Sequence, residues 1–423
     1  MFKFRKNIHT AVIEKNKETY DLPFERMPDP DEIIILLPQF EGDTSKIIVE
    51  EGAYVVKGQR IAEDMESIPV HSSISGNVEE ILELRVHGSE KRTGVRIVSD
   101  GKGKISEKVI VPEIETKKAY LDCIRRAGVL NGKIPAFKDF NREKVTGIVV
   151  SGLESDTVIT AGYRTLEEDI ETIVAGISVT MKYLEADNAV ICISEEYTGL
   201  IEDVKKGTST HGSIFVKPVK KIYVPENEKI KRMVLSGTGS ESDDILYTDI
   251  WAMLEIGTFF KTGMPVVEKR ITVAGDIIRE HKNLIVPLGA RIADVIQYCG
   301  GYIKEPRKII DNGTMTGRCL SSDRLPVTKE TRGIIAFEGK KSLMPPVKNC
   351  IRCGACYRTC PEELMPIYIS KAFAKGKLKS LIALKAEKCI SCGCCTYSCP
   401  AKIPLHKICT EAKSLLEEVK ANG

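Results

Sequence analysis

Cys350-Ile-Arg-Cys353-Gly-Ala-Cys356-Tyr-Arg-Thr-Cys360-Pro and Cys389-Ile-Ser-Cys392-Gly-Cys-Cys395-Thr-Tyr-Ser-Cys399-Pro repeat one cysteine spacing near the end of the chain. In each run, three cysteines separated by two residues are followed by a fourth cysteine and a proline. This spacing holds [4Fe–4S] clusters in two-cluster ferredoxins, where small residues let short loops bring three thiolates to one cluster. The repeat therefore predicts a ferredoxin-like module that exchanges single electrons.

The fourth cysteine of each run is expected to serve the other cluster, because two-cluster ferredoxins share their ligands in this crossed way. The predicted ligands of one cluster are Cys350, Cys353, Cys356 and Cys399. The predicted ligands of its partner are Cys389, Cys392, Cys395 and Cys360. The crossing would tie the two halves of the module together.

Zinc is a weaker interpretation of the same cysteines, since a zinc ribbon uses two Cys-x2-Cys pairs per metal and would leave thiolates surplus. Cys394 interrupts no spacing, so it is a bystander, a residue beside a cluster or a replacement ligand. Cys409 follows the second run in a helical pattern and is interpreted as a buried thiol.

Composition excludes several classes of protein. The 423 residues carry 62 Lys and Arg against 59 Asp and Glu, and this balance argues against a nucleic-acid partner. Neither an apolar stretch of about 18 residues nor a signal peptide is evident. Fourteen cysteines are then expected as metal ligands and free thiols in the cytoplasm rather than as disulfides.

The remaining chain predicts a multidomain α/β and α+β protein. A polar N-terminal lead covers 1–31. Closely spaced turns in 32–115 favour a carrier-like barrel-sandwich hybrid, in which His71 is interpreted as structural. Alternating helices and strands in 116–230 indicate an α/β layer, 231–340 contains a β-grasp unit, and 341–423 holds the ferredoxin-like module.

Clusters only pass electrons, so a second redox group is expected at the other end of the path, and the α/β region is the natural place for it. No Gly-x-Gly-x-x-Gly follows a strand there. The run Gly128-Val-Leu-Asn-Gly-Lys-Ile-Pro135 could offer a few backbone N–H groups to a phosphate, but it is favoured as a plain turn. Ser236–Asp244 is also interpreted as a turn, and Lys217, Lys220 and Lys221 as a solvated loop or a partner patch.

The order of these parts resembles the RnfC-like electron transport proteins over nearly the whole chain. Besides the cysteine runs, the resemblance is carried by Ile271-Thr-Val-Ala-Gly275, Val286-Pro-Leu-Gly289, Pro326-Val-Thr-Lys329 and Gly333-Ile-Ile-Ala336. It implies an SLBB-like β-grasp unit and an α/β domain similar to the flavoprotein subunit of respiratory complex I. In membrane Rnf complexes, such a protein binds FMN and oxidises NADH.

The chain departs from the family where FMN would bind. The acidic motif of the family survives as Ser151-Gly-Leu-Glu154, followed by Tyr163-Arg164, and the N-terminal His-Pro-Pro motif is missing. The glycine-dense flavin loop of the family is shortened to Gly128, Gly132, Pro135 and Lys138. These losses argue against FMN and make the chain most similar to the branch of the family associated with proline reductase.

Three hypotheses follow. The first is an electron-transfer protein that relays electrons from a redox partner to a dedicated reductase, with proline reductase favoured by the resemblance. The second is the NADH-oxidising FMN subunit of a membrane Rnf complex, peripheral to the inner face of the membrane. The third is a non-catalytic scaffold or redox sensor.

Overall fold

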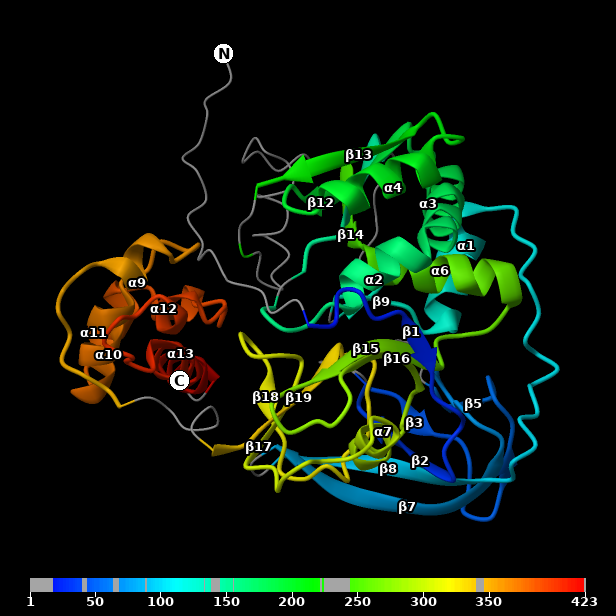
Figure 1. The fold of residues 1–423 in the computed structure, drawn as a ribbon, viewed down its shortest axis with the longest axis horizontal. Helices are drawn as coiled ribbons and strands as arrows, with labels where there is room; N and C mark the ends of the chain where they lie inside the picture. Colours follow the sequence, from blue (N-terminus) through cyan, green and yellow to red (C-terminus); the bar gives the residue numbers. More distant parts are fainter. Residues whose placement is uncertain are drawn as a thin grey trace.

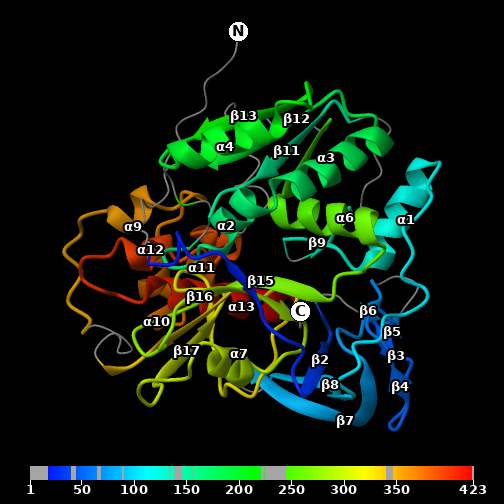
Figure 2. The same cartoon turned by 45° about the vertical axis from the view of Figure 1, so that its right-hand side comes forward.

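The computed structural model describes residues 18–39, 44–63, 68–87, 90–132, 134–137, 145–154, 156–220, 223, 244–339 and 346–421. The expected multidomain α/β and α+β fold is confirmed. The β-grasp sheet lies between the barrel-sandwich unit and the α/β layer, and the cysteine-rich module stands at one side of this body (Figures 1 and 2).

The barrel-sandwich unit consists of two antiparallel sheets. Its apolar run 33–37 has two buried faces: Ile33 and Ile35 join the main core, whereas Ile34 packs with Leu325 of the β-grasp unit. This explains why the run is continuously apolar rather than alternating. One sheet contains β2 (Glu32–Leu37), β8 (Glu90–Ser99), β7 (Gly76–His87) and β4 (Tyr54–Val55), and the other β3 (Lys46–Ile47), β5 (Arg60–Glu63) and β6 (Val70–His71).

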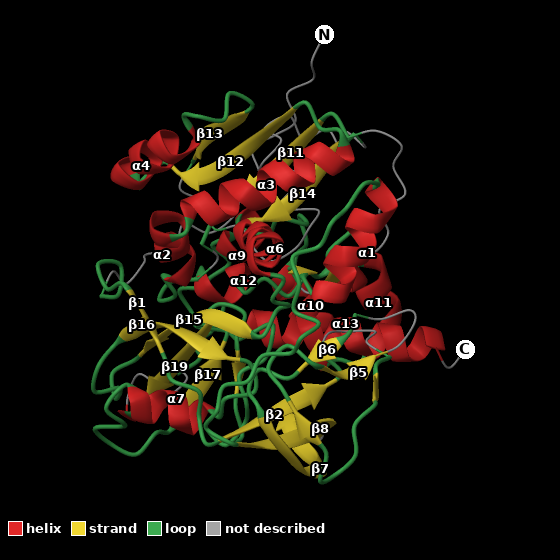
Figure 3. Ribbon diagram, turned by 90° about the vertical axis from the view of Figure 1, so that its right-hand side faces the viewer, coloured by secondary structure: helices red, strands yellow, loops and turns green. Residues whose placement is uncertain are grey.

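The α/β layer is built on a parallel sheet in the order β13-β12-β11-β14. Helices α3 and α6 lie between this sheet and the β-grasp sheet (Figure 3). The strands are β11 (Gly147–Ser151), β12 (Asn188–Ser194), β13 (Ile214–Val219) and β14 (Ile245–Asp249), with a small pair β9 (Leu130–Asn131) and β10 (Ile134–Pro135). The helices are α1 (Lys117–Ala127), α2 (Ala161–Glu168), α3 (Ile170–Leu184), α4 (Thr198–Thr208) and α6 (Ile250–Thr262).

The sequence predicts one helix from Leu166 to Leu184, and the structure divides this region at Asp169. The Asp169 carboxylate accepts hydrogen bonds from Arg270 Nε at 2.8 Å and Nη2 at 3.1 Å. Because Arg270 lies on the neighbouring β-grasp sheet, this ion pair holds the break between α2 and α3 against that sheet.

The β-grasp unit is a six-stranded sheet with one covering helix. Its edge strand comes from the N-terminal lead, since β1 pairs in parallel with β16 through Phe24 and Asn283. The chain therefore crosses the molecule before the barrel-sandwich unit begins. The strands are β1 (Phe24–Arg26), β16 (Lys282–Pro287), β15 (Glu268–Ala274), β19 (Gly333–Phe337), β17 (Lys308–Asp311) and β18 (Arg318–Cys319), and the helix is α7 (Ile292–Tyr298).

The C-terminal module has its own core, in which Leu364, Ile369, Leu381 and Leu416 pack with Cys409. The sequence predicts a single helix between the cysteine runs, but this helix is interrupted around Gly376, whose φ of +60° ends the first segment. The module contains α9 (Ala355–Arg358), α10 (Pro366–Ala374), α11 (Leu378–Ala383), the 3-10 helix η1 (Ala386–Lys388), α12 (Cys394–Tyr397) and α13 (Leu405–Ala421).

Helices α3 and α6 cross at two glycines. A Cβ on Gly176 would lie 1.9 Å from the Met253 carbonyl oxygen, and a Cβ on Gly257 would lie 2.0 Å from that of Thr172. We predict that Gly176→Ala lowers the free energy of unfolding by about 1–3 kcal/mol through overpacking. Urea denaturation followed by circular dichroism measures this change.

Gly199→Ala is the matched control, because Gly199 lies in α4 with no atom within 4 Å of an added Cβ. The control is expected to change the free energy of unfolding by less than about 0.5 kcal/mol, because Gly199 is exposed in the first turn of the helix. Equal effects of the two substitutions would contradict the proposed crossing.

His71 lies in the core of the barrel-sandwich unit, with 5% of its surface exposed. Burial, reinforced by the charges of Lys329 and Arg60, lowers the pKa of His71 to about 3. Below pH 6.5 the unfolded chain binds a proton that the folded chain does not, so stability falls as the pH decreases from about 6.5 towards 3. Between pH 6.5 and 5.5 this contribution amounts to about 1 kcal/mol.

We therefore predict that His71→Gln has a flatter pH dependence of unfolding than the natural chain. The measurement is the difference in unfolding free energy between the two proteins at pH 6.5 and at pH 5.5. Parallel pH profiles would show that His71 titrates normally in the folded protein.

Candidate metal centre

The two cysteine runs share one backbone conformation. The second residue after the first cysteine has a positive φ in both runs, +58° at Arg352 and +51° at Ser391. Gly354 and Gly393 then adopt φ of +74° and +79° and lead into the short helices α9 and α12. A side chain with a Cβ is disfavoured at these angles, so the glycines permit the sharp turn from loop to helix.

The second run meets the fourth cysteine of the first run. Cys389, Cys392, Cys395 and Cys360 line one small cavity, together with flanking residues that include Cys409. Cys360 comes from the chain after α9, whereas Cys389 and Cys392 precede α12 and Cys395 lies within it. The four side chains that the crossed assignment gives to one cluster therefore line a common cavity, which Cys394 also lines.

The same enclosure disfavours free thiolates. Burial raises the pKa of Cys360 to about 12 and also raises that of Cys389. A hydrogen bond with the Cys409 thiol, together with burial, raises the pKa of Cys395. Bound iron would reverse this tendency, because a coordinating thiol is deprotonated by the charge of the metal.

Backbone N–H groups already point at several sulfurs. Leu364 N donates to Cys360 Sγ at 3.3 Å, and Arg352 N donates to Cys350 Sγ at 3.4 Å. Hydrogen bonds of this kind favour the anionic form of a sulfur and tune the potential of a cluster.

The four cysteines assigned to the other cluster are less closely assembled. Cys356 and Cys399 belong to one apolar cluster, in which Cys395 also takes part. Cys350 and Cys353 lie on an exposed loop. In the part of the chain that the structure describes, no three Cys, His, Asp or Glu side chains converge as ligands of a single metal ion.

The module contacts the body through the side of the second run. Cys394 is fully buried and packs with Tyr223, Met315 and the neighbouring Cys392. A Cβ on Gly393 would lie 2.7 Å from the Met315 carbonyl oxygen, so the two backbones approach closely. Cys394 thus lies beside the predicted cluster site, at the contact with the β-grasp unit.

The loop that carries Met315 is held by Asp156 of the α/β layer. The Asp156 carboxylate accepts hydrogen bonds from Thr314 N at 2.7 Å and Met315 N at 2.9 Å. Burial raises the pKa of Asp156, and these backbone donors oppose the rise. Sequence reasoning missed this link, because neither an isolated Asp-Thr pair nor Gly-Thr-Met indicates a contact across domains.

The carboxyl edge of the parallel sheet is a second candidate site, because α/β folds bind ligands at this edge. A cavity of about 100 Å³ is lined there by Gly132, Glu154 and Arg332, among others. Gly132 N donates to Asp249 Oδ2 at 3.3 Å, and the buried Lys329 ammonium donates to Gly128 O at 2.9 Å. Ligand pockets usually occupy about 300–1,000 Å³.

The expected plain turn at 128–135 therefore has its groups engaged within the protein. Pro135 belongs to β10, whereas Lys138 lies outside the described residues. Most of Ser236–Asp244 and Lys221 also lie outside them, while Lys217 lies in β13 and Lys220 directly follows it. The described residues do not form a phosphate cradle for FMN.

The retained acidic motif has a local structural role. Glu154 Oε2 accepts hydrogen bonds from the backbone N–H groups of Gly162 at 3.1 Å and Tyr163 at 3.3 Å, at the start of α2. A carboxylate at this position compensates the unpaired N–H groups of a helix end.

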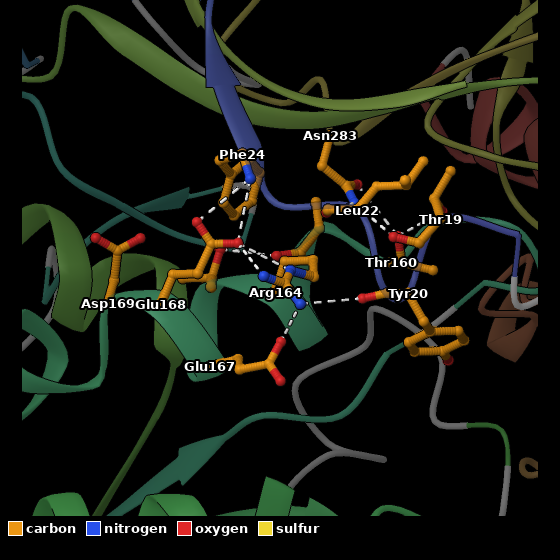
Figure 4. Close-up of polar contacts among 12 residues, drawn as sticks. Thr19, Tyr20, Leu22, Phe24, Thr160, Arg164, Glu167, Glu168, Asp169 and Asn283 are labelled. Carbon is orange, nitrogen blue, oxygen red and sulfur yellow. Dashed lines mark hydrogen bonds and ion pairs between the residues drawn. The ribbon is translucent and has the colours of Figure 1, made fainter. Parts of the chain in front are cut away.

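Helix α2 also anchors the N-terminal segment. Arg164 forms ion pairs with Glu167 and Glu168 and donates to Tyr20 O at 3.2 Å (Figure 4). Asn283 Nδ2 donates to the carbonyl oxygens of Thr19 at 2.7 Å and Leu22 at 3.0 Å, so the segment is fixed between α2 and the β-grasp sheet.

Comparison with known families covers most of the chain. Residues 2–102 match the RnfC barrel sandwich hybrid domain, 133–255 the Nuo51 FMN-binding domain, 270–318 the SLBB domain and 349–403 the 4Fe-4S dicluster domain. One subunit of the proton-translocating ferredoxin:NAD(+) oxidoreductase complex of Clostridium ljungdahlii is 31% identical over 87% of this chain and 83% of its own length. The chain belongs to the RnfC family.

More distant relatives support this assignment. The corresponding subunit of the Na(+)-translocating ferredoxin:NAD(+) oxidoreductase complex of Acetobacterium woodii is 28% identical over 87% of this chain and 86% of its own length. Its counterpart in the ion-translocating oxidoreductase complex of Rhodobacter capsulatus is 28% identical over 99% of this chain and 84% of its own length.

A solved NAD+-reducing [NiFe]-hydrogenase in the H2-reduced state has a similar fold. Its TM-score is 0.51 at 12% identity, and the match covers 73% of this chain and 64% of that chain.

These comparisons bear directly on the predicted cofactors. The dicluster match supports [4Fe–4S] clusters in the C-terminal module. The Nuo51 match makes FMN plausible, which corrects the expectation that the shortened loop argues against it. The chain is therefore an electron-transfer protein of the RnfC family. The assignment of individual cysteines to the two clusters stays a prediction.

The crossed arrangement predicts distinct effects for the two fourth cysteines. Cys360→Ala should empty chiefly the site of Cys389, Cys392 and Cys395, and Cys399→Ala chiefly the other site. Iron and sulfide should each fall from about eight to about four per chain in either variant, as expected for the loss of one of two [4Fe–4S] clusters. Electron paramagnetic resonance of the reduced proteins distinguishes which cluster is left.

Cys409→Ala is the control, because Cys409 is a buried thiol beside the same cavity without a predicted ligand role. It should retain both clusters. Equal loss of iron from the two sites in a folded Cys360 or Cys399 variant would contradict the crossing.

Proposed function

We propose that the chain relays single electrons between protein partners through two [4Fe–4S] clusters. Cys350, Cys353, Cys356 and Cys399 hold one cluster, and Cys389, Cys392, Cys395 and Cys360 hold the other. The observation that carries the proposal is the cavity in which Cys360 joins the three cysteines of the second run. The four thiols come from both runs, as a shared ferredoxin-type module requires.

The proposed acceptor is a dedicated reductase, and proline reductase is the favoured one. This choice rests on the resemblance to the proline reductase-associated electron transfer protein (PrdC). A chain of this kind would receive electrons from a reduced redox protein instead of from NADH.

The second candidate is the FMN-bearing, NADH-oxidising subunit of a membrane Rnf complex. The Nuo51 FMN-binding match over 133–255 favours it, as do the relatives, which are subunits of ferredoxin:NAD(+) oxidoreductase complexes. FMN would supply the conversion between two-electron hydride transfer and single-electron steps.

The location of the protein follows from its partners. No helix in the described part of the chain is long and apolar enough to cross a membrane. In the first function the chain would work in the cytoplasm, and in the second it would be peripheral to the inner face of the membrane through other subunits.

The two functions make opposite predictions for protein reconstituted anaerobically with iron, sulfide and FMN. The relay predicts clusters that dithionite reduces and that proline reductase, supplied with proline as the electron acceptor, then reoxidises. No flavin is retained, and NADH does not bleach the clusters. The Rnf function predicts retained FMN and NADH-dependent bleaching of the clusters. Absorbance spectra of the desalted protein before and after each addition measure both.

A protein that fills with iron and sulfide but exchanges electrons with neither partner would support the third candidate, a redox sensor or scaffold. A protein that retains FMN and is bleached by NADH would overturn the proline reductase assignment. Because both results leave the clusters in place, they distinguish the acceptor from the relay itself.

A further inference from the structure

The two predicted cluster sites differ in their surroundings. The second run faces the body of the protein, where Gly393 and Cys394 contact Met315. The first run faces away, and both Cys350 and Cys353 are exposed. We call the site of the first run the outer site. Of the two predicted cluster sites, the outer site is the more accessible to a partner protein that exchanges electrons with the module.

Large exposed apolar side chains flank the cysteines of the outer site along the chain. Val347, Ile351 and Tyr357 expose 59%, 68% and 47% of their surfaces, and each lies within four residues of Cys350 or Cys353. Exposed apolar groups in one place commonly mark an interaction surface. The exposure of these three side chains has no explanation within the described protein.

Positive charge accompanies the apolar groups. Lys348, Arg352, Arg358 and Lys402 are exposed, and none forms an ion pair with an acid in the described ranges. Lys348 N donates to Ala401 O at 2.9 Å, which brings Lys402 beside the first run.

The sequence concentrates this charge in the module. No Asp or Glu occurs between Pro346 and Pro361, and residues 346–404 carry ten Lys or Arg against three Glu. The whole chain, by contrast, is nearly balanced at 62 against 59. The basic face therefore belongs to the electron-transfer module in particular.

We infer that Val347, Lys348, Ile351, Arg352, Tyr357 and Lys402 form a docking face for an acidic one-electron carrier protein. This inference rests on the proposed relay, because it assumes a cluster at the outer site. Opposite charge steers a carrier to this face and orients it, while the apolar side chains exclude water from the contact. The reduced carrier loses one electron and the outer cluster gains it, and no bond is made or broken.

An anionic membrane surface would also attract a basic apolar face. The shape of this face argues against that partner. Peripheral membrane segments usually present a long amphipathic helix with a wide apolar side. Here the exposed groups lie on loops and on the four-residue helix α9, directly around two predicted cluster ligands. Such a face matches the small contact area of a transient redox complex better.

The test uses the full chain with its clusters and flavodoxin as the acidic carrier. Fully reduced flavodoxin gives one electron to the protein and becomes a neutral semiquinone, which stopped-flow absorbance follows. The second-order rate constant should fall at least about tenfold as salt is raised from low to high concentration. The triple variant Lys348→Glu, Arg352→Glu, Lys402→Glu should be about tenfold slower than the natural chain at low salt.

The matched control is Lys375→Glu, Lys377→Glu, Lys379→Glu, which changes the net charge equally on the turn between α10 and α11 and on the first turn of α11. Its rate constant should stay within about twofold of the natural value. Arg358 is left unchanged because its guanidinium donates to Cys353 O at 2.8 Å and supports the loop. Iron, sulfide and reduction by dithionite should be equal in all three proteins.

The outcomes separate the inference from the relay. A natural chain whose rate does not depend on salt, or a triple variant as fast as the control, would overturn the docking face while the relay stands. A second measurement is binding to vesicles of phosphatidylglycerol and phosphatidylcholine in equal parts. If they bind the natural chain but not the triple variant, and the two proteins react with flavodoxin at the same rate, the face belongs to a membrane contact. Failure of dithionite to reduce the natural chain would refute the relay itself. If the triple variant loses iron, the salt dependence of the natural chain decides the question.

Discussion

The architecture of the module depends on the meeting of Cys360 with Cys389, Cys392 and Cys395. Four thiols in an apolar enclosure are costly to ionise without metal, as the raised pKa values of Cys360 and Cys389 show. A cluster that binds them would replace this cost with coordination bonds and would join two segments about thirty residues apart. Folding of the module and assembly of its clusters are then one process, as in other small metal domains.

This constraint extends to the rest of the protein through a short series of contacts. Asp156 at the α/β layer holds the loop of Met315, and Met315 in turn contacts Gly393 and Cys394. The second run is thereby fixed against the body, whereas the exposed Cys350 and Cys353 face outward. The same fold could thus connect a redox group in the body with a partner outside. The family relationship shows that relatives of this chain work within oxidoreductase complexes, and the basic outer face gives a physical reason for contact with a separate carrier.

Local patterns predicted much of this structure. Helix α1 spans Lys117–Ala127 as its apolar spacing indicates, with Thr116 as its N-terminal cap and Gly128 after its last turn. The cysteine spacing also predicted that Cys360 would serve the cluster of the second run; this assignment stays a prediction, although Cys360 and the three cysteines line one cavity. Breaks in helices were missed at Asp169 and Gly376, where a cross-domain ion pair and a left-handed glycine override continuous apolar spacing. The pairing of β1 with β16 joins residues about 260 positions apart, and no short pattern in Phe24–Arg26 indicates its partner. The same holds for Asp156 and Met315, whose roles depend on tertiary contacts alone.

The most direct test of the central claim is the metal and sulfide content of anaerobically isolated protein, combined with electron paramagnetic resonance after reduction by dithionite. Two shared [4Fe–4S] clusters predict about eight iron and eight sulfide per chain, with the signals of two reduced clusters. Zinc without inorganic sulfide, and no paramagnetic signal after dithionite, would contradict the account.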